Sequence, residues 1–236
     1  MTVLLALDSA TESLALALAA DDKLHLREED GGAQASARIV PLVHELLAEA
    51  GLRLADLDAI AFGRGPGAFT GLRTACAVAQ GLAFGAGKPV VPVDSLLIVA
   101  EDARCQAEAA GTPLTGAIWV AMDARMDEIY AARYRWDGAH WETLNEPALY
   151  APDALRARWG QPDAAAGNAL EVFAAVLGTV TPSWPHTQSR AAALGRLAEQ
   201  AWQQGLRLDA AEAQPIYVRD KVALTTAERL AAGGVR

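Results

Sequence analysis

Residues 57–72 read LDAIAFGRGPGAFTGL, an apolar run followed by a glycine-rich turn. The run Leu57–Phe62 predicts a buried strand, and the apolar Leu72–Ala86 after the glycines predicts a helix. The backbone N–H groups of such a turn, together with the first turn of the helix, could hold an anion. The same glycines could instead serve only to let strand and helix pack closely, and composition does not decide between these two interpretations.

The glycine-rich turn matches the common nucleotide motifs poorly. It is not a Walker A loop, because no Gly-Lys-Ser/Thr closes it. Residues 63–68 satisfy the looser G-x-G-x-x-A pattern, but the turn follows the fourth expected strand, and the next acidic residue at a strand end, Asp94, is too distant. A dehydrogenase that binds NAD is therefore the weakest hypothesis.

Asp8 is a second candidate for chemistry, because it ends the first apolar run and is followed by the hydroxyls of Ser9 and Thr11. An aspartate in this place can hold a hydrated Mg²⁺ near a phosphate, or it can simply form an Asx turn. Asp123 ends a similar run later in the chain. The candidate residues for binding a nucleotide or another anion are Asp8, Gly65, Gly67 and Thr70.

The rest of the first half predicts alternating strands and helices. Strands are expected at 2–7, 13–19, 23–29, 57–62 and 90–93, and helices at 36–50, 72–86 and 95–110. This order, βββαβαβα, predicts an α/β fold in which helices flank a mixed sheet.

The opening pattern then recurs. After the break at 111–113, the strand Ala117–Met122 ends at Asp123, a second strand covers Glu128–Tyr134, and a third begins at Trp141. The repetition indicates a duplicated domain, with boundaries at 1–110 and 111–236. The sequence leaves open whether the last helices pack back on the first domain.

Composition excludes several classes of protein. The chain has 29 acidic and 20 basic residues among 236, a net charge of -9, which argues against a non-specific nucleic-acid binder. Its two cysteines cannot form a disulfide scaffold or a cysteine metal site. Neither a signal peptide nor a membrane span is recognisable, so we expect a cytoplasmic protein that does not bind membranes.

The sequence contains no evident catalytic centre. Its histidines, at 25, 44, 140 and 186, lack the spacing that a helix uses to bind a metal. Neither cysteine has a neighbouring histidine, and no G-x-S-x-G nucleophile elbow occurs. This pattern favours a binding role.

The helices expected at 36–50 and 72–86 are candidates for a partner surface, since the second is apolar or small on nearly every side. The alternative is that the second domain covers both helices. The residues predicted to contact a partner are Ile39, Leu42, Val43, Leu46, Leu72, Ala75, Cys76, Ala79, Leu82 and Ala83.

Five segments together resemble the TsaB (YeaZ) family. They are LLALDSATE at 4–12, IVPLVHELL at 39–47, DAIAFGRGPGAFTGLR at 58–73, MDARMDEIY at 122–130 and PIYVR at 215–219. The resemblance implies an actin-like (ASKHA) fold of two related domains. It also implies a non-catalytic partner subunit in the synthesis of threonylcarbamoyladenosine at adenosine 37 of tRNAs that read A-starting codons.

By the same resemblance, the expected partners are a TsaD-type catalytic subunit, which this chain would bind and activate, and a TsaE-type ATPase. The complex would use ATP and Mg²⁺, the isolated chain would hold no cofactor, and tRNA would be met only through the complex. Without the catalytic subunit, we expect a homodimer through the two candidate helices.

Two departures from the related sequences matter. The TsaD-type subunit binds its metal through an H-x-x-x-H pair, and the matching positions here are Ser95 and Val99, so no metal site is expected. Many members carry His-Ser-Glu where this chain has Ala35-Ser36-Ala37, which puts contacts through those side chains in doubt. The alternative function is an active ASKHA-type phosphotransferase, with Asp8 and the glycine turn holding nucleotide and Mg²⁺, or a glycoprotease-like metallopeptidase.

Overall fold

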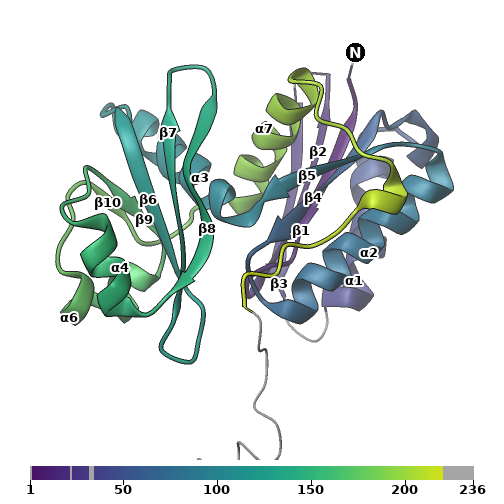
Figure 1. The fold of residues 1–236 in the computed structure, drawn as a ribbon. Coiled ribbons are helices and arrows are strands. Elements are labelled where there is room, and N and C mark those ends of the chain that lie inside the picture. The colour runs from purple at the N-terminus through teal and green to yellow at the C-terminus, as the bar shows by residue number, and fades with distance from the viewer. Residues whose placement is uncertain (1, 22, 32–34, 220–236) are drawn as a thin grey trace, which may run out of the picture.

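A computed structural model describes residues 2–21, 23–31 and 35–219, which form two lobes side by side (Figure 1). Lobe I contains the sheet β1–β5 with helices α1, α2 and α7 and the segment 206–219. Lobe II contains the sheet β6–β10 with helices α4, α5 and α6. Helix α3 (Ser95–Ala109) lies between the lobes.

The sheet of lobe I has the order β3-β2-β1-β4-β5. β1, β2 and β3 form an antiparallel meander, and β4 and β5 extend it in parallel from β1, so the predicted mixed sheet is confirmed. The strands are β1 (Leu4–Asp8), β2 (Ser13–Ala20), β3 (Lys23–Asp30), β4 (Ala59–Gly65) and β5 (Val90–Asp94).

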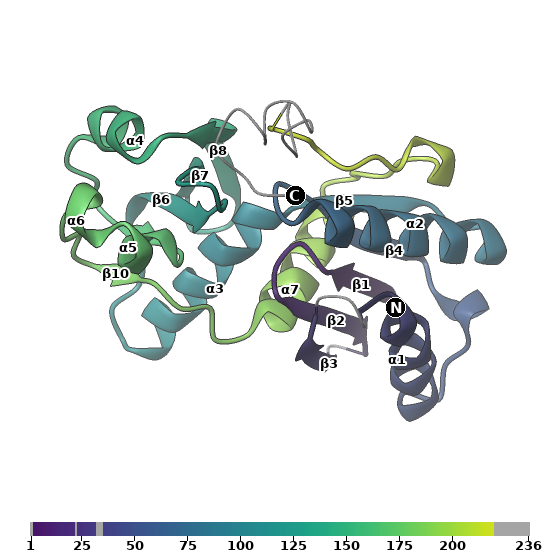
Figure 2. The same cartoon turned by 90° about the horizontal axis from the view of Figure 1, so that it is seen from below.

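Helices cover both faces of this sheet, which is why its central strands are apolar throughout. α1 (Ala35–Glu49) and α2 (Phe69–Ala86) lie on one face, and α7 (Arg190–Gln203) lies on the other (Figures 1 and 2). Because side chains alternate along a strand, Leu5 of β1 packs toward α1 and α2, while Leu4 packs toward α7. One strand thus contributes to two hydrophobic clusters.

Lobe II repeats the same topology. Its sheet has the order β10-β9-β6-β7-β8, with an antiparallel meander on one side of β6 and parallel strands on the other. The predicted duplication is therefore confirmed by the strand order. The strands are β6 (Gly116–Asp123), β7 (Ile129–Trp136), β8 (Trp141–Tyr150), β9 (Ala165–Ala166) and β10 (Ser183–Trp184), and the helices are α4 (Pro152–Trp159), α5 (Ala169–Val172) and α6 (Ala174–Leu177).

The chain after α7 returns along lobe I. Leu208 exchanges two backbone hydrogen bonds with Val90 at the edge of β5, of 2.9 and 3.0 Å. The 3-10 helix η3 (Ala210–Glu212) then packs on α2, where the Gln80 amide donates to the Ala210 carbonyl at 2.8 Å. Figure 2 shows this segment, in yellow, beside β5 and α2.

This segment corrects the predicted partner surface. α2 has a second buried side because the C-terminal segment of the same chain covers it, with Ala210 and Ala213 in the hydrophobic cluster. The residues that we predicted to contact a partner lie in the core of lobe I, where Leu82 is partly buried and the others are buried: Ile39, Leu42, Val43, Leu46, Leu72, Ala75, Cys76, Ala79, Leu82 and Ala83. A partner would therefore meet other residues of these helices.

Candidate functional site: the cleft between the lobes

The glycine-rich turn fits closely against the turn between β1 and β2. A Cβ atom on Gly67 would lie 2.3 Å from the Ala10 carbonyl oxygen, and one on Gly71 would lie 1.8 Å from the Ser9 carbonyl oxygen. The Ala68 N–H donates to the Ala10 carbonyl at 2.7 Å. Close packing of the two turns therefore accounts for these glycines without a bound anion.

Gly65 belongs to the same arrangement. Its φ of +107° is a conformation that favours glycine, and its N–H donates to Ser95 Oγ at 3.0 Å. The Ile216 carbonyl oxygen would lie 2.9 Å from a Cβ on this residue, so the C-terminal segment closes the other side of the turn. Ser95 Oγ in turn donates to Asp8 Oδ2 at 2.9 Å.

Asp8 is fully buried and is bound on all sides by its own chain. Oδ1 accepts hydrogen bonds from Arg190 Nε of α7 at 2.8 Å and from the Ala10 N–H at 3.2 Å, while Ser95 binds Oδ2. The Cβ of a residue replacing Gly63 would lie 1.6 Å from Oδ2, so only glycine leaves room for the carboxylate. The Arg190 guanidinium therefore pairs with the carboxylate directly and balances its charge.

A cleft of about 700 Å³ lies between the lobes above this buried pair. Of the candidate anion-binding residues, Gly67 lines the cleft, while Asp8 and Gly65 lie beneath its wall, joined through Ser95. Thr70 is exposed on the first turn of α2, where its carbonyl accepts from Thr74 Oγ1 at 2.9 Å. The four residues thus do not converge on one point in the cleft.

The mouth of the cleft carries an aromatic and cationic cluster that sequence reasoning missed. The Arg73 guanidinium carbon lies 3.7 Å from the centre of the Phe69 ring, and Arg73 Nε donates to the Tyr217 hydroxyl at 3.0 Å. The Phe69 and Tyr217 rings are 5.2 Å apart. The sequence did mark residues 215–219, PIYVR, through the family resemblance. Nothing in the spacing of this segment, however, predicts that it contacts α2.

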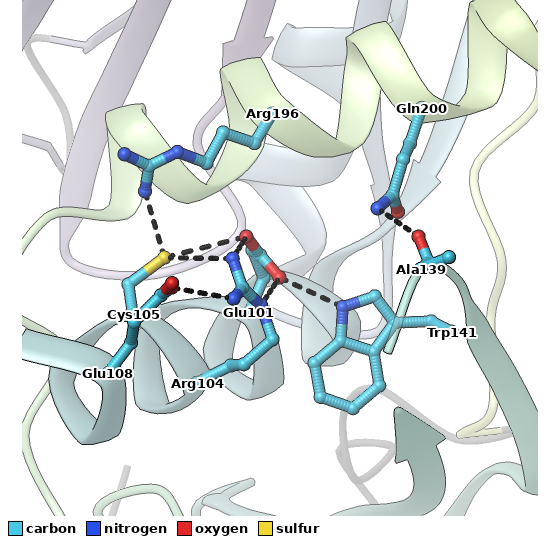
Figure 3. A network of polar contacts seen from close by, with 8 residues as sticks. All are labelled: Glu101, Arg104, Cys105, Glu108, Ala139, Trp141, Arg196 and Gln200. Carbon is cyan, nitrogen blue, oxygen red and sulfur yellow. Dashed lines mark hydrogen bonds and ion pairs between the residues drawn. The ribbon is translucent and has the colours of Figure 1, made fainter. Parts of the chain in front are cut away.

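Opposite the mouth, a polar network joins α3, α7 and the β7–β8 turn (Figure 3). The buried Glu101 carboxylate accepts from Arg104 at 2.7 and 2.8 Å and from Trp141 Nε1, at the start of β8, at 2.9 Å. Gln200 of α7 donates to the Ala139 carbonyl at 3.1 Å. We call these five residues the α3–α7 network.

Cys105 borders this network but is poorly suited to nucleophilic chemistry. Burial, with the neighbouring Glu101 carboxylate as a smaller cause, raises the pKa of its thiol to about 11. Burial also raises the pKa of the Cys76 thiol. Both groups are therefore protonated near neutral pH.

The two positions that the resemblance aligns with metal ligands of a TsaD-type subunit make other contacts. Ser95 is bonded to Asp8, and Val99 is an apolar residue packed between α3 and lobe II. Within 2–21, 23–31 and 35–219, no three His, Cys, Asp or Glu side chains are grouped so that they could hold a metal ion.

In the same part of the chain, no helix is long and apolar enough to cross a membrane.

The exposed faces of α1 and α2 combine small or apolar residues with charged ones, which include Glu45 and Glu49 on α1 and Arg73 on α2. On α2, Ala77 and Gly81 are exposed, and the side chain of Phe84 is 58% exposed. On α1, Ser36, Ala37 and Pro41 are exposed, and Val40 is 39% exposed. Ala35 begins α1, and its side chain lies outside the described residues. We call Val40, Pro41, Ala77, Gly81 and Phe84 the α1–α2 face.

Comparison with known proteins gives consistent matches over nearly the whole chain. The family model described as "TsaD: tRNA N6-adenosine threonylcarbamoyltransferase" matches residues 29–231. The tRNA threonylcarbamoyladenosine biosynthesis protein TsaB of Escherichia coli K12 is 31% identical, over 93% of this chain and 96% of its own. The solved structure of YeaZ from Pseudomonas aeruginosa superimposes with a TM-score of 0.81 at 35% identity, over 92% of this chain and 100% of its own.

Two lobes with one strand order, facing each other across a cleft, place the molecule in the actin-like (ASKHA) class. Within that class the matches to this chain extend over both lobes. The chain belongs to the TsaB (YeaZ) family.

Proposed function

We propose that this chain is a non-catalytic subunit in tRNA threonylcarbamoyladenosine biosynthesis, which binds and activates a TsaD-type catalytic subunit. The name of the E. coli relative, a tRNA threonylcarbamoyladenosine biosynthesis protein, supports the pathway. The observation that carries the non-catalytic role is the buried Asp8–Arg190 pair, with a distance of 2.8 Å. An aspartate that is neutralised within its own chain is not free to hold Mg²⁺ beside a nucleotide.

The same pair weighs against the alternative, an active ASKHA-type phosphotransferase. That activity would need Asp8 to face the cleft beside the glycine turn, whereas Asp8 is bonded to α3 and α7 and does not line the cleft that Gly67 lines. A glycoprotease-like metallopeptidase would need metal ligands where Ser95 and Val99 stand. Binding of Mg-ATP to the purified chain, followed by turnover, would overturn the non-catalytic proposal.

The α1–α2 face is the surface proposed to dock on the partner. Phe84 supplies an apolar anchor, and Ala77 and Gly81 allow the backbone of a partner helix to approach closely. The same face would pair two copies of this chain in a homodimer when the catalytic subunit is absent. In the full complex, a TsaE-type ATPase would take part, and the complex would use ATP and Mg²⁺, whereas the isolated chain would need no cofactor. The chain would contact tRNA only as part of this complex, which would work in the cytoplasm.

The docking proposal is tested by Ala77→Arg. The exposed side chain should leave the fold intact but place a bulky charge in the interface, which we expect to weaken binding of the TsaD-type subunit at least about 100-fold. Affinity is measured by calorimetry, and threonylcarbamoyladenosine by mass spectrometry of tRNA nucleosides from a depleted strain.

Ala157→Arg, on exposed α4 of lobe II, is the matched control and should bind normally. Ala79→Arg would be a poor probe, because Ala79 is buried in the core and the variant would fail to fold. If Ala77→Arg and the control bind the catalytic subunit equally well, the partner docks elsewhere.

A further inference from the structure

We propose that Ile216–Arg219 is a latch that holds the two lobes closed at the mouth of the cleft and ties their closure to helix α2. These residues line the cleft together with residues of both lobes. In Figure 1 the segment that leads to them, in yellow, crosses the front of lobe I and ends at the lower side of the molecule, where the β6–β7 turn of lobe II also lies.

One end of the latch is anchored on lobe I. The Ile216 N–H donates to the Arg64 carbonyl, at the end of β4, at 2.6 Å. The Tyr217 ring packs on Phe69, and its hydroxyl accepts from Arg73. Phe69 and Arg73 lie on the first turns of α2, so a movement of this end of the helix would move the latch.

The other end reaches lobe II through Arg219. Its guanidinium donates to Glu128 Oε2 at 2.6 Å, to the Ala124 carbonyl at 3.1 Å and to the Arg125 carbonyl at 3.3 Å. The side chain is only 12% exposed, so water screens these bonds weakly. The other ion pair across the mouth, between Glu12 and Arg125, has side chains 85% and 72% exposed and should hold the lobes much less.

The turn that receives Arg219 is strained. Arg125, Met126 and Asp127 have φ angles of +61°, +58° and +54°, three successive non-glycine residues in the left-handed region. By bonding the carbonyls of Ala124 and Arg125, Arg219 stabilises this turn from outside. If the latch is released, the turn loses that support and can relax.

The closed latch also contains a buried hydrogen-bond donor that has no acceptor among the described residues. Arg219 Nε is buried and finds no hydrogen-bond partner in the described part of the chain. A buried donor without a partner disfavours the state that contains it. The strained turn and this unpaired donor both reduce the preference for the closed state, so a modest change in contacts at α2 can shift the equilibrium.

The α3–α7 network provides the opposite, fixed side of such a motion. It joins α3 and α7 to the β7–β8 turn, at the other end of lobe II's meander from the β6–β7 turn that holds Arg219 (Figures 1 and 3). Opening the latch would thus let lobe II rotate about this network and widen the cleft at its mouth. The link to a partner on α2 rests on the function proposed above, whereas the latch itself does not.

The latch is tested on the isolated full chain by spin labels at Ala55→Cys in lobe I and Ala157→Cys in lobe II. Both positions are exposed. Native Cys76 and Cys105 have raised thiol pKa values and should react slowly, and the chain without added cysteines gives the background. Pulsed electron paramagnetic resonance reports the distance between lobes, and hydrogen exchange reports the order of residues 124–128.

Arg219→Ala should add a longer component to the interlobe distances and raise exchange in 124–128 about tenfold or more. Arg125→Ala removes the exposed pair with Glu12 and the contact with Asp123 inside lobe II but leaves the bonds of Arg219 in place, so it should resemble the wild type in the interlobe distance. If Arg219→Ala gives the wild-type distance distribution, the latch is refuted, whether or not the chain binds a catalytic subunit.

A second measurement tests the link to α2. Tyr217→Ala removes the anchor on Phe69 and Arg73 and leaves Arg219 in place. Adding the TsaD-type subunit should shift the interlobe distance in the wild type and shift it less in Tyr217→Ala. An equal shift in both would refute the link. Failure of the wild type to bind at all would instead count against the proposed function.

Discussion

Arg190 of α7 and Asp8 of β1 form a buried ion pair 2.8 Å long, although 182 positions separate them in the chain. The pair joins the helix on one face of the lobe I sheet to the end of its central strand. Arg190 also donates to the Ser95 carbonyl at 3.2 Å, so the contact fixes α3 as well. Arg190 therefore holds the Asp8 carboxylate in a contact within its own chain.

Removing Arg190 should strongly destabilise the chain. Arg190→Met leaves the Asp8 carboxylate buried without its charge partner, and we expect the free energy of unfolding in urea to fall by about 3–5 kcal/mol. Arg53→Met, which breaks an exposed pair with Asp56, is the control and should change stability little. In the double variant Asp8→Asn with Arg190→Met, the two losses should not add, because each removes the same pair. Additive losses would mean that the two side chains act separately.

The two glycines of α2 at 71 and 81 should respond in opposite ways to alanine. Gly71→Ala places a Cβ 1.8 Å from the Ser9 carbonyl oxygen, and the backbone shift needed should cost about 1–3 kcal/mol or more. Gly81→Ala meets nothing within 4 Å on an exposed helix and should add about 0.5–1 kcal/mol. Thermal unfolding of both variants measures this contrast. Equal effects would contradict the packing of the glycine turn against the β1–β2 turn. Gly67→Val should resemble Gly71→Ala, because Ala10 leaves no room for it.

Glu101 and Glu108 both bind Arg104, but only the first should matter for stability. Glu101→Gln weakens the buried bonds of the carboxylate to Arg104 and Trp141, with an expected cost of about 2–4 kcal/mol. Glu108 is 66% exposed, so its pair with Arg104 is screened and Glu108→Gln should cost less than about 0.5 kcal/mol. Urea unfolding followed by tryptophan fluorescence compares the two. A cost for Glu108→Gln as large as that for Glu101→Gln would show that burial does not set the strength of this network.

The Cys105 thiol should react slowly with iodoacetamide below its raised pKa. Only the thiolate reacts, and with a pKa of about 11 its fraction at pH 8 is about 100-fold lower than at the ordinary value of 9.0. The rate should therefore keep rising as the pH increases toward 11. The same chain unfolded in urea is the reference, since burial, the main cause of the shift, is lost there. A native rate at pH 8 equal to the unfolded rate would show that the thiol is accessible and normal.

Local patterns were sufficient for most of the fold. The apolar run at 13–19 and the apolar residues spaced for a helix in 36–50 predicted β2 and α1 well, since β2 is buried on both faces and α1 on one. The two-residue strands β9 and β10 were not predicted, because two residues are too few to show a period. The short helices α5 and α6 have only four residues each, which is too few to show a helical period in the sequence.

Long-range contacts explain where prediction of the site failed. α2 is apolar on nearly every side, which suggested an external partner, but Ala210 and Ala213 of the same chain cover its second side. No motif connects Asp8 with Arg190, so the sequence could not show that its candidate cation ligand was already paired. The glycine turn was located correctly, and only the contacts with Ser9, Ala10 and Ile216 revealed its structural role.

The return of the chain to lobe I also affects folding during synthesis on the ribosome. The strands β1 to β5 are made first, yet α7 and the residues around Ala210 are needed to cover their sheet and complete its core. The sheet of lobe II is contained in the continuous stretch 116–184, which emerges before α7. Lobe II can therefore finish folding while one face of lobe I still lacks its helix, so the part of the protein that is synthesised first is completed last.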